Sequence, residues 1–374
     1  MTTRWTESPS ATALPVLDLR DFNAAGLGAQ LRFITRLREV AHKEGFFYLR
    51  GHGVPSAEAD QVFRLAREFF NLPRAQKQAI HMAQSPHFRG YTAAGEEITR
   101  GARDWREQLD IGAERPALPS TGAEQAWRRL QGPNQWPEHL PELQPALLAW
   151  QDRLTAVGQQ LLDALALALH QPPNCFEDAF GHEPVQHLKI IRYPGRSDLG
   201  AGQREQGVGA HKDSGCLTLL QQDRCGGLQV KIEGRWVDVQ PLPGTLVVNL
   251  GEVLEMLTGG YLRATVHRVV SPPLGADRLS VAFFLGPRMD SDLHDLHLPP
   301  ALAQRARGVE VDPLNPLIRH AGRNFLKGRL RSHPEVAQAF YQDVGLAEAD
   351  SLSAHLPAPL PAIRSRSAGL STQA

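Results

Sequence analysis

Residues 209 to 286 read GAHKDSGCLTLLQQDRCGGLQVKIEGRWVDVQPLPGTLVVNLGEVLEMLTGGYLRATVHRVVSPPLGADRLSVAFFLG. This segment holds the only His-x-Asp in the chain, at His211 and Asp213, and a further histidine, His267. Side chains two residues apart on a strand point to the same face, so His211 and Asp213 can direct an imidazole and a carboxylate to one point. A second strand can bring His267 there. Two imidazoles and one carboxylate on one face of a metal are the ligand set of non-haem Fe(II) oxygenases.

The same segment ends with the only Arg-x-Ser in the chain, at Arg278 and Ser280. The two-residue spacing again predicts one face, where a guanidinium fork and a hydroxyl could hold a carboxylate. A His-x-Asp by itself is most often a solvated surface pair. The ordered set of His-x-Asp, distal His and Arg-x-Ser is what makes the metal interpretation specific.

The hydrophobic pattern predicts the fold around this segment. From residue 185 onward, short apolar or alternating runs are separated by Gly, Pro and Asp, which is typical of a sandwich or jelly roll. Earlier in the chain, apolar residues at helical spacing predict amphipathic helices, the longest running from Leu143 to Leu169. We therefore expect an α+β, mainly β protein, with a double-stranded β-helix (jelly-roll) core flanked by helices.

The domain organisation follows from these patterns. We expect a disordered arm at 1–13, an N-terminal helical and strand region at 14–120, a linker with the long spine helix at 121–184, the jelly-roll core at 185–290, a C-terminal helical region at 291–349 and a disordered tail at 350–374. Within the second of these, residues 81–112 have no sustained period and predict a loop laid over the site.

Composition limits the possible partners and location. Forty basic residues balance forty acidic ones, so no overall field favours nucleic acid or an anionic membrane. No run approaches the ~20 apolar residues of a membrane span. Three cysteines, Cys175, Cys216 and Cys225, form neither an even framework nor a CxxC motif. These features predict a cytoplasmic protein that binds neither nucleic acid nor membrane.

At this point the chain resembles the iron- and 2-oxoglutarate-dependent dioxygenases of the isopenicillin N synthase-like family. The resemblance covers roughly residues 14 to 340 and rests on segments including LPVLDL at 14–19, GFFYLRGHGV at 45–54, IIRYPG at 190–195, GAHKDSGCLTLL at 209–220 and ATVHRV at 264–269. It implies an enzyme that uses Fe(II), 2-oxoglutarate and O2 to hydroxylate or desaturate a small molecule, with release of succinate and CO2.

The resemblance also implies roles for single residues. His211, Asp213 and His267 would bind the iron, and Arg278 and Ser280 would bind the far carboxylate of 2-oxoglutarate. Many members use an Asn-x-Tyr for the same co-substrate. Tyr193 matches its tyrosine, whereas Ile191 stands where the asparagine would be. No protein acid or base is required for catalysis beyond these ligands.

The substrate is read less directly from the sequence. In relatives the region of Phe88, Arg89 and Tyr91 approaches the substrate, and Arg192 and Phe284 could line the same pocket. The two arginines favour an acidic small molecule such as an amino acid or another carboxylate. Three alternatives stay open: an oxidase that needs no 2-oxoglutarate, as in isopenicillin N synthase, an ethylene-forming type of enzyme, and a non-catalytic jelly-roll binding protein.

Overall fold

The computed structural model describes residues 14–120, 122–195, 206–310, 312 and 315–344. The arm expected at 1–13 and the tail expected at 350–374 lie outside these residues. An eight-stranded sheet, here called the major sheet, has the strand order β1-β2-β12-β9-β14-β7-β6-β3. All of its neighbouring strands are antiparallel except β1 and β2. The strands are β1 Val16–Asp18, β2 Phe46–Arg50, β3 Gly90–Thr92, β6 Glu107–Gly112, β7 Val185–Pro194, β9 Leu217–Gln222, β12 Leu246–Leu250 and β14 Asp277–Gly286.

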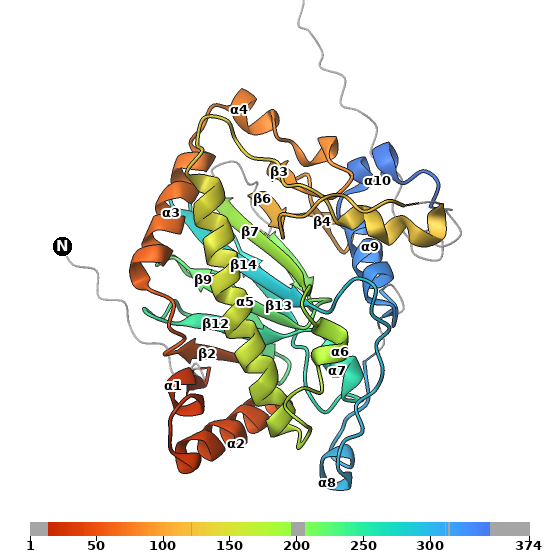
Figure 1. Ribbon diagram of the computed structural model, residues 1–374. Coiled ribbons are helices and arrows are strands. Elements are labelled where there is room, and N and C mark those ends of the chain that lie inside the picture. Colours follow the sequence, from red (N-terminus) through yellow and green to blue (C-terminus); the bar gives the residue numbers. More distant parts are fainter. Residues whose placement is uncertain (1–13, 121, 196–205, 311, 313–314, 345–374) are drawn as a thin grey trace, which may run out of the picture.

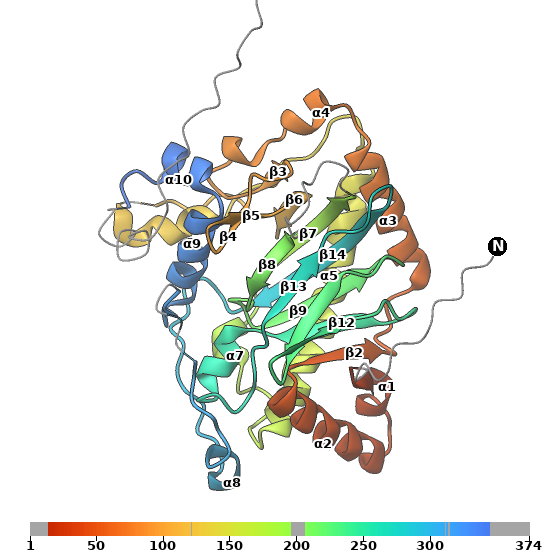
Figure 2. The ribbon, with the colours of Figure 1, turned by 180° about the vertical axis from the view of Figure 1, so that it is seen from behind.

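A four-stranded sheet, the minor sheet, has the order β11-β10-β13-β8. Its strands are β8 Gln206–His211, β10 Leu228–Ile232, β11 Arg235–Asp238 and β13 His267–Val270. Its inward valines pack with residues of the major sheet in one buried cluster that includes Val208, Val230, Val269, Ile191, Val247 and Ala282. Two antiparallel sheets closed around such an interior form a jelly roll, seen from the minor-sheet side in Figure 2. The predicted fold class is confirmed.

Helices cover the other face of the major sheet (Figure 1). The long helix α5, Leu143–Ala168, contacts β14, β7 and β9, and α2, Leu27–Lys43, and α3, Ser56–Phe70, pack against α5. The buried leucines of α5 recur at helical spacing, which explains why the sequence pattern predicted this helix. The remaining helices are α1 Leu19–Phe22, α4 Arg74–Gln78, η1 Met82–Gln84, η2 Ala123–Leu130, α6 Glu177–Phe180, α7 Glu252–Leu257, α8 Pro300–Ala303, α9 Ala321–Ser332 and α10 Pro334–Phe340.

Alternate side chains of strand β14 point to opposite faces of the major sheet, one covered by the helices and the other facing the minor sheet. Leu279, Val281, Phe283 and Leu285 join the core beneath the helices. Arg278 and Ser280 point the opposite way, into the space between the two sheets, as their two-residue spacing predicts. This interior face carries the candidate site.

The prediction of a loop at residues 81–112 is wrong. This segment contributes β3 and β6 to the edge of the major sheet, and a hairpin of β4, Ile98–Thr99, with β5, Ala102–Arg103. All six residues of β6 are buried. Gln108 and Asp110 face the interior, whereas Leu109 and Ile111 alternate with them and pack in the core beneath the helices. Two apolar residues are too short a run to stand out from the mixed sequence around them. Among the described residues, no helix is long and apolar enough to cross a membrane.

Candidate active site

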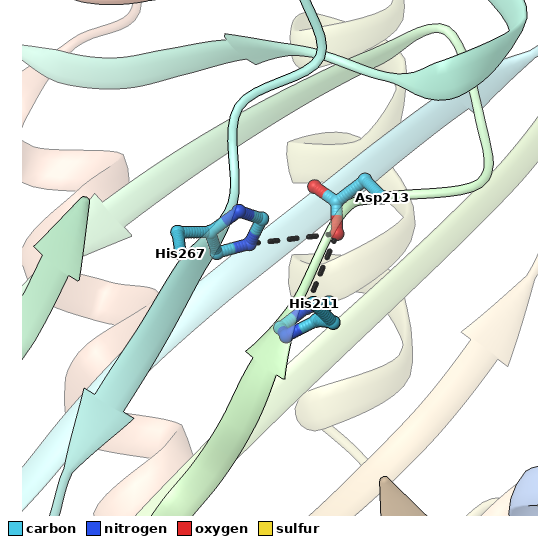
Figure 3. A group of neighbouring side chains, drawn as sticks. All are labelled: His211, Asp213 and His267. Atoms are coloured by element: carbon cyan, nitrogen blue, oxygen red, sulfur yellow. Dashed lines mark ion pairs between the residues drawn. The ribbon is translucent and has the colours of Figure 1, made fainter. Parts of the chain in front are cut away.

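Three predicted ligand side chains meet at the end of the minor sheet (Figure 3). His211 is the last residue of β8 and lies directly across from His267, the first residue of β13. The Nε2 atoms of His211 and His267 lie 3.4 and 3.6 Å from Asp213 Oδ1. One ligand atom from each of the three lies within 4.8 Å of the others, so the group could hold one metal ion. Asp213 differs from expectation in one respect, because it lies just beyond the strand and not on it.

Backbone carbonyls fix the orientation of both imidazoles. His211 Nδ1 lies 2.7 Å from the carbonyl of Gly209, and His267 Nδ1 lies 3.1 Å from that of Thr265. Because a carbonyl only accepts, each Nδ1 carries a proton, which leaves Nε2, the atom facing Asp213, as the nitrogen that can bind a metal.

The carboxylate of Asp213 is buried and held by its second oxygen. Thr218 Oγ1 and Asn249 Nδ2 both donate to Oδ2, the latter at 2.7 Å, which leaves Oδ1 facing the imidazoles. Although burial opposes ionisation, the two histidines and Thr218 hold the pKa of Asp213 well below its usual value. Burial lowers the pKa of His267 to about 4. An ionised carboxylate beside a neutral imidazole is ready to bind a cation.

The two donors to Asp213 give a first prediction. Replacing Asn249 by leucine or Thr218 by valine should weaken Mn(II) binding to the metal-free protein by roughly 10- to 100-fold, because the carboxylate loses its orienting partner. Isothermal titration would measure this affinity. The control is Thr258→Val, since Thr258 is buried but bonds only to groups in and just after α7. Unchanged affinity in both test variants would show that the hydrogen bonds do not position the ligand.

A buried arginine lies on the same interior face. Arg278 is 0% exposed, and it donates to Ser280 Oγ at 3.2 Å and to Gln222 Oε1 at 3.1 Å. Among the described residues it has no carboxylate partner, and its Nε has no hydrogen-bond partner. A buried guanidinium without a counter-ion is costly. The site therefore fits an anionic group brought in by a ligand.

The neighbours of Arg278 were only partly visible in the sequence. Tyr193 lies opposite it on β7, with the guanidinium carbon 4.8 Å from the ring centre. Ile191 lies opposite Ser280, and Gln108 on β6 lies beside Ile191. Gln108 is fully buried, and its Oε1 has no hydrogen-bond partner among the residues that the structure describes. The side-chain amide of Gln108 therefore lies next to Ile191, the position where the family has asparagine. Gln108 belongs to β6, a strand that was not predicted from the sequence.

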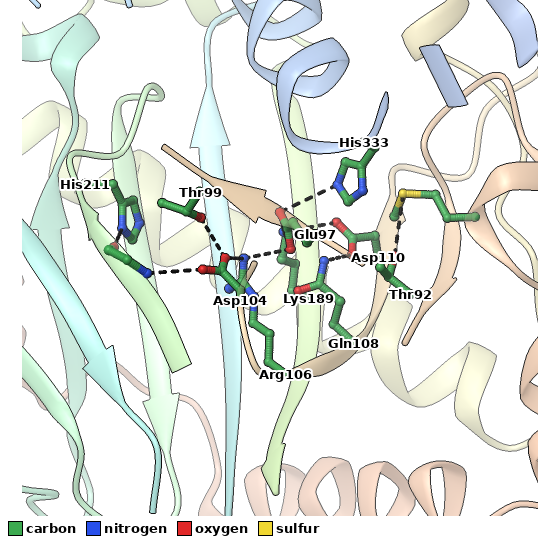
Figure 4. Close-up of polar contacts among 12 residues, drawn as sticks. Thr92, Glu97, Thr99, Asp104, Arg106, Gln108, Asp110, Lys189, His211 and His333 are labelled. Carbon is green, nitrogen blue, oxygen red and sulfur yellow. Dashed lines mark hydrogen bonds and ion pairs between the residues drawn. The ribbon is translucent and has the colours of Figure 1, made fainter. Parts of the chain in front are cut away.

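A buried network of charges extends from the histidines across the interior (Figure 4). Asp104 accepts from the backbone N–H of Gly209, next to His211, and pairs with Arg106 at 3.2 Å. Arg106 and Lys189 both pair with Glu97, at 2.7 and 3.0 Å. Further along, Asp110 pairs with His187, Lys189 and Arg329. Burial of Glu97 and Asp110 would raise their pKa values, but the neighbouring cations keep both pKa values below their usual range.

The network predicts a pH dependence of stability. Burial lowers the pKa of His333, which lies 3.6 Å from Glu97, to about 4. The unfolded histidine, with a pKa near 6.5, binds a proton between these two values while the folded one does not. The free energy of unfolding should therefore decrease as the pH is lowered through this window. The protonation of His333 in the unfolded state should account for a loss of about 2 kcal/mol between about pH 7 and about pH 5.

Urea denaturation of the wild type, His333→Gln and the exposed-site control His294→Gln at both pH values would check this prediction. The His333 variant should lose less stability on acidification than the other two proteins. Equal losses in all three would mean that His333 is protonated in the folded state at about pH 5.

The predicted substrate contacts lie in different places. Phe88 packs with Tyr341 in a separate hydrophobic cluster, and Tyr91 and Arg192 face the helical layer, where they bind Glu107. Their placement argues against substrate contact. Phe284 faces the interior, paired in register with Thr218. Arg89 is buried near the same region.

Phe284 connects the ligand cluster to two arginines. His187 stacks on Phe284 with ring centres 5.3 Å apart, and Arg329 of α9 donates to His187 at 2.9 Å. Arg89 donates to the carbonyl of Leu130, but its Nε has no partner and it forms no ion pair among the described residues. Burial, with Arg329 nearby, lowers the pKa of Arg89 to about 10. Arg329 had no sequence signal, because it lies on a helix far along the chain.

Comparisons with known proteins agree with this geometry. The profile of the non-haem dioxygenase in morphine synthesis N-terminal matches residues 14–139, and that of the 2OG-Fe(II) oxygenase superfamily matches residues 184–287. The chain belongs to the 2OG-Fe(II) oxygenase superfamily. More particularly, it is a 2-oxoglutarate-dependent non-haem iron dioxygenase of the isopenicillin N synthase-like group, which uses Fe(II), 2-oxoglutarate and O2 to oxidise a small-molecule substrate.

Curated relatives and solved structures are similar along most of the chain. The 2-oxoglutarate-dependent dioxygenase frbJ of Dothideomycetidae sp. is 33% identical, covering 94% of this chain and 99% of its own. A homoarginine-6-hydroxylase of Arabidopsis thaliana is 34% identical, covering 71% and 80%. A full-length Neurospora crassa protein, solved with alpha-KG and 5-formyluracil, shares the fold with a TM-score of 0.68 at 23% identity, covering 91% and 100%.

Proposed function

We propose that His211, Asp213 and His267 hold the Fe(II) and that Arg278, Ser280 and Tyr193 hold 2-oxoglutarate. The observation that carries this proposal is the convergence of three ligand atoms within 4.8 Å at the end of the interior that also contains Arg278, which has no ion pair among the described residues. Iron loaded with 2-oxoglutarate and O2 supplies the oxidant for a substrate C–H bond, with release of succinate and CO2.

The protein's own residues position the reactants. Gly209 and Thr265 fix the tautomers of the imidazoles, and Thr218 and Asn249 orient the carboxylate. Arg278 offers a rigid fork, which suits the far carboxylate of 2-oxoglutarate better than a point charge would. The surrounding apolar cluster excludes water from this end of the interior and so strengthens each polar contact.

We further propose that the substrate is an amino acid or another small carboxylate. Arg89 and Arg329 share one nearby carboxylate, Asp110, and Arg89 has no ion pair among the described residues. A substrate carboxylate between the two guanidinium groups would relieve this excess of buried positive charge. Phe284, which lies between them and the ligand cluster, would pack against the rest of the substrate. Hydroxylation of a polar amino acid is in keeping with the homoarginine-6-hydroxylases among the relatives.

Succinate release by the Fe(II)-loaded enzyme, with 2-oxoglutarate and a panel of amino acids and carboxylates, would test both proposals. Each acid is paired with its primary amide. We expect turnover of an acid and loss of most activity with its amide, and a higher KM for that acid in Arg89→Gln. Turnover confined to uncharged compounds would contradict the substrate proposal alone. Oxygen uptake that needs no 2-oxoglutarate would instead favour the oxidase alternative, and headspace ethylene the ethylene-forming one. A cytoplasmic location stays a prediction from composition.

A further inference from the structure

A cavity lies beside the candidate metal-binding segment, which lines it with Lys212. Its volume is about 390 Å³, and its walls come from the β10–β11 hairpin, the segment before β13, helix α7 and the segment after α8. Its lining residues are Lys212, Lys231, Gly234, Glu255, Gly260, Arg263, Ala264, Val266, Arg307, Gly308, Val309 and Glu310. None of the residues in the candidate active site lines it.

Positive charge dominates the lining. Cationic side chains outnumber carboxylates four to two, and both carboxylates are engaged by one cation, since Lys212 Nζ lies 2.9 Å from Glu255 and 3.2 Å from Glu310. The other cations have no ion pair among the described residues. Arg263 gives one N–H to the carbonyl of Lys43, while Lys231 and Arg307 have no side-chain hydrogen bond there.

The three cations without ion pairs come from separate segments that backbone hydrogen bonds hold together. The N–H of Lys231 donates to the carbonyl of Val266 at 2.8 Å, and that of Arg307 donates to the carbonyl of Gly260 at 3.3 Å. A side chain on Gly260 would collide with the backbone of Gly308, so the two segments approach as closely as glycine allows. The cations therefore surround one preformed space.

We propose that this cavity is a binding site for a small oxyanion with two or more negative charges, such as a phosphate or a di- or tricarboxylate. Lys231, Arg263 and Arg307 supply the charge, and the volume admits a ligand of that size. The site adjoins the metal centre, because Lys212 stands between His211 and Asp213 in the chain and Val266 precedes His267. This proposal does not depend on which substrate the enzyme oxidises.

The test is binding of inorganic phosphate and of citrate to the full-length protein, measured by isothermal titration and by the shift in thermal midpoint. The test variant is Lys231→Glu with Arg307→Glu. Both side chains are exposed, so the fold should tolerate the change, and circular dichroism without anion would check it. The charge-matched control is Arg32→Glu with Arg36→Glu, two exposed residues of α2. Arg278→Leu serves as a second control, because it removes the other anion anchor.

We expect saturable binding of at least one of the two anions to the wild type and to both controls, and at least tenfold weaker binding to the double variant. Preference between the two anions would identify the ligand as phosphate-like or carboxylate-like. Absence of saturable binding to the wild type would overturn the proposal. So would loss of binding in Arg278→Leu with retention in the double variant, since the anion would then occupy the 2-oxoglutarate site.

Discussion

Replacing Asp213 by alanine should abolish 2-oxoglutarate turnover and weaken Mn(II) binding by more than about 100-fold, since loss of an orienting neighbour alone costs up to that factor. Asp213 is the only carboxylate in the cluster, and its removal leaves two neutral imidazoles and the unpaired donors of Thr218 and Asn249. Succinate release and isothermal titration with Mn(II) would measure the two effects.

The control for this variant is Asp238→Ala. Asp238 is an exposed carboxylate on β11 of the same minor sheet and bonds only to Gln229. The control should bind Mn(II) as the wild type does. Retention of tight metal binding by Asp213→Ala would place the metal elsewhere in the protein.

Replacing Arg278 by leucine should weaken 2-oxoglutarate binding by about 2 to 5 kcal/mol, roughly 30-fold to several thousand-fold, because the co-substrate carboxylate would be buried without its partner. Arg278→Lys keeps the positive charge but not the bidentate geometry, so its affinity for 2-oxoglutarate should lie between those of Arg278→Leu and the wild type. Titration of 2-oxoglutarate into the Mn(II)-loaded protein measures the affinity directly, apart from catalysis.

The Arg278→Leu substitution should not destabilise the ligand-free protein, unlike most replacements of buried residues. Arg278 is fully buried and has no counter-ion in the part of the chain that the structure describes, so Arg278→Leu should leave the thermal midpoint of the ligand-free protein unchanged or higher. A marked loss of stability together with unchanged 2-oxoglutarate affinity would show that Arg278 is a structural residue and not the anchor.

The amino-acid sequence predicts the structure best where functional residues follow the strand alternation. The spacing of Arg278 and Ser280 placed both on the interior face of β14, and the order of the motifs located the residues that meet at the end of the minor sheet. The leucine periodicity located α5 for a similar reason, because one face of that helix is buried along its whole length.

The sequence failed where polar residues are buried. Gln108 and Asp110 occupy inward positions of β6 and alternate with only two apolar residues, Leu109 and Ile111, so the short strand did not stand out and was interpreted as a loop. Partners such as Arg329 and His187 lie far apart in the chain, and only the closed fold brings them to Asp110. Tyr91 was expected near the substrate because the matching region approaches it in relatives, and Arg192 was expected to line the same pocket, whereas both side chains face the helices.

The most direct test of the central claim is anomalous diffraction from crystals of the protein grown with Mn(II) and 2-oxoglutarate. We expect one strong metal peak bonded to Nε2 of His211, Nε2 of His267 and Oδ1 of Asp213, with the far carboxylate of 2-oxoglutarate on the guanidinium of Arg278. A metal peak away from these three side chains, or 2-oxoglutarate bound without contact to Arg278, would contradict the account.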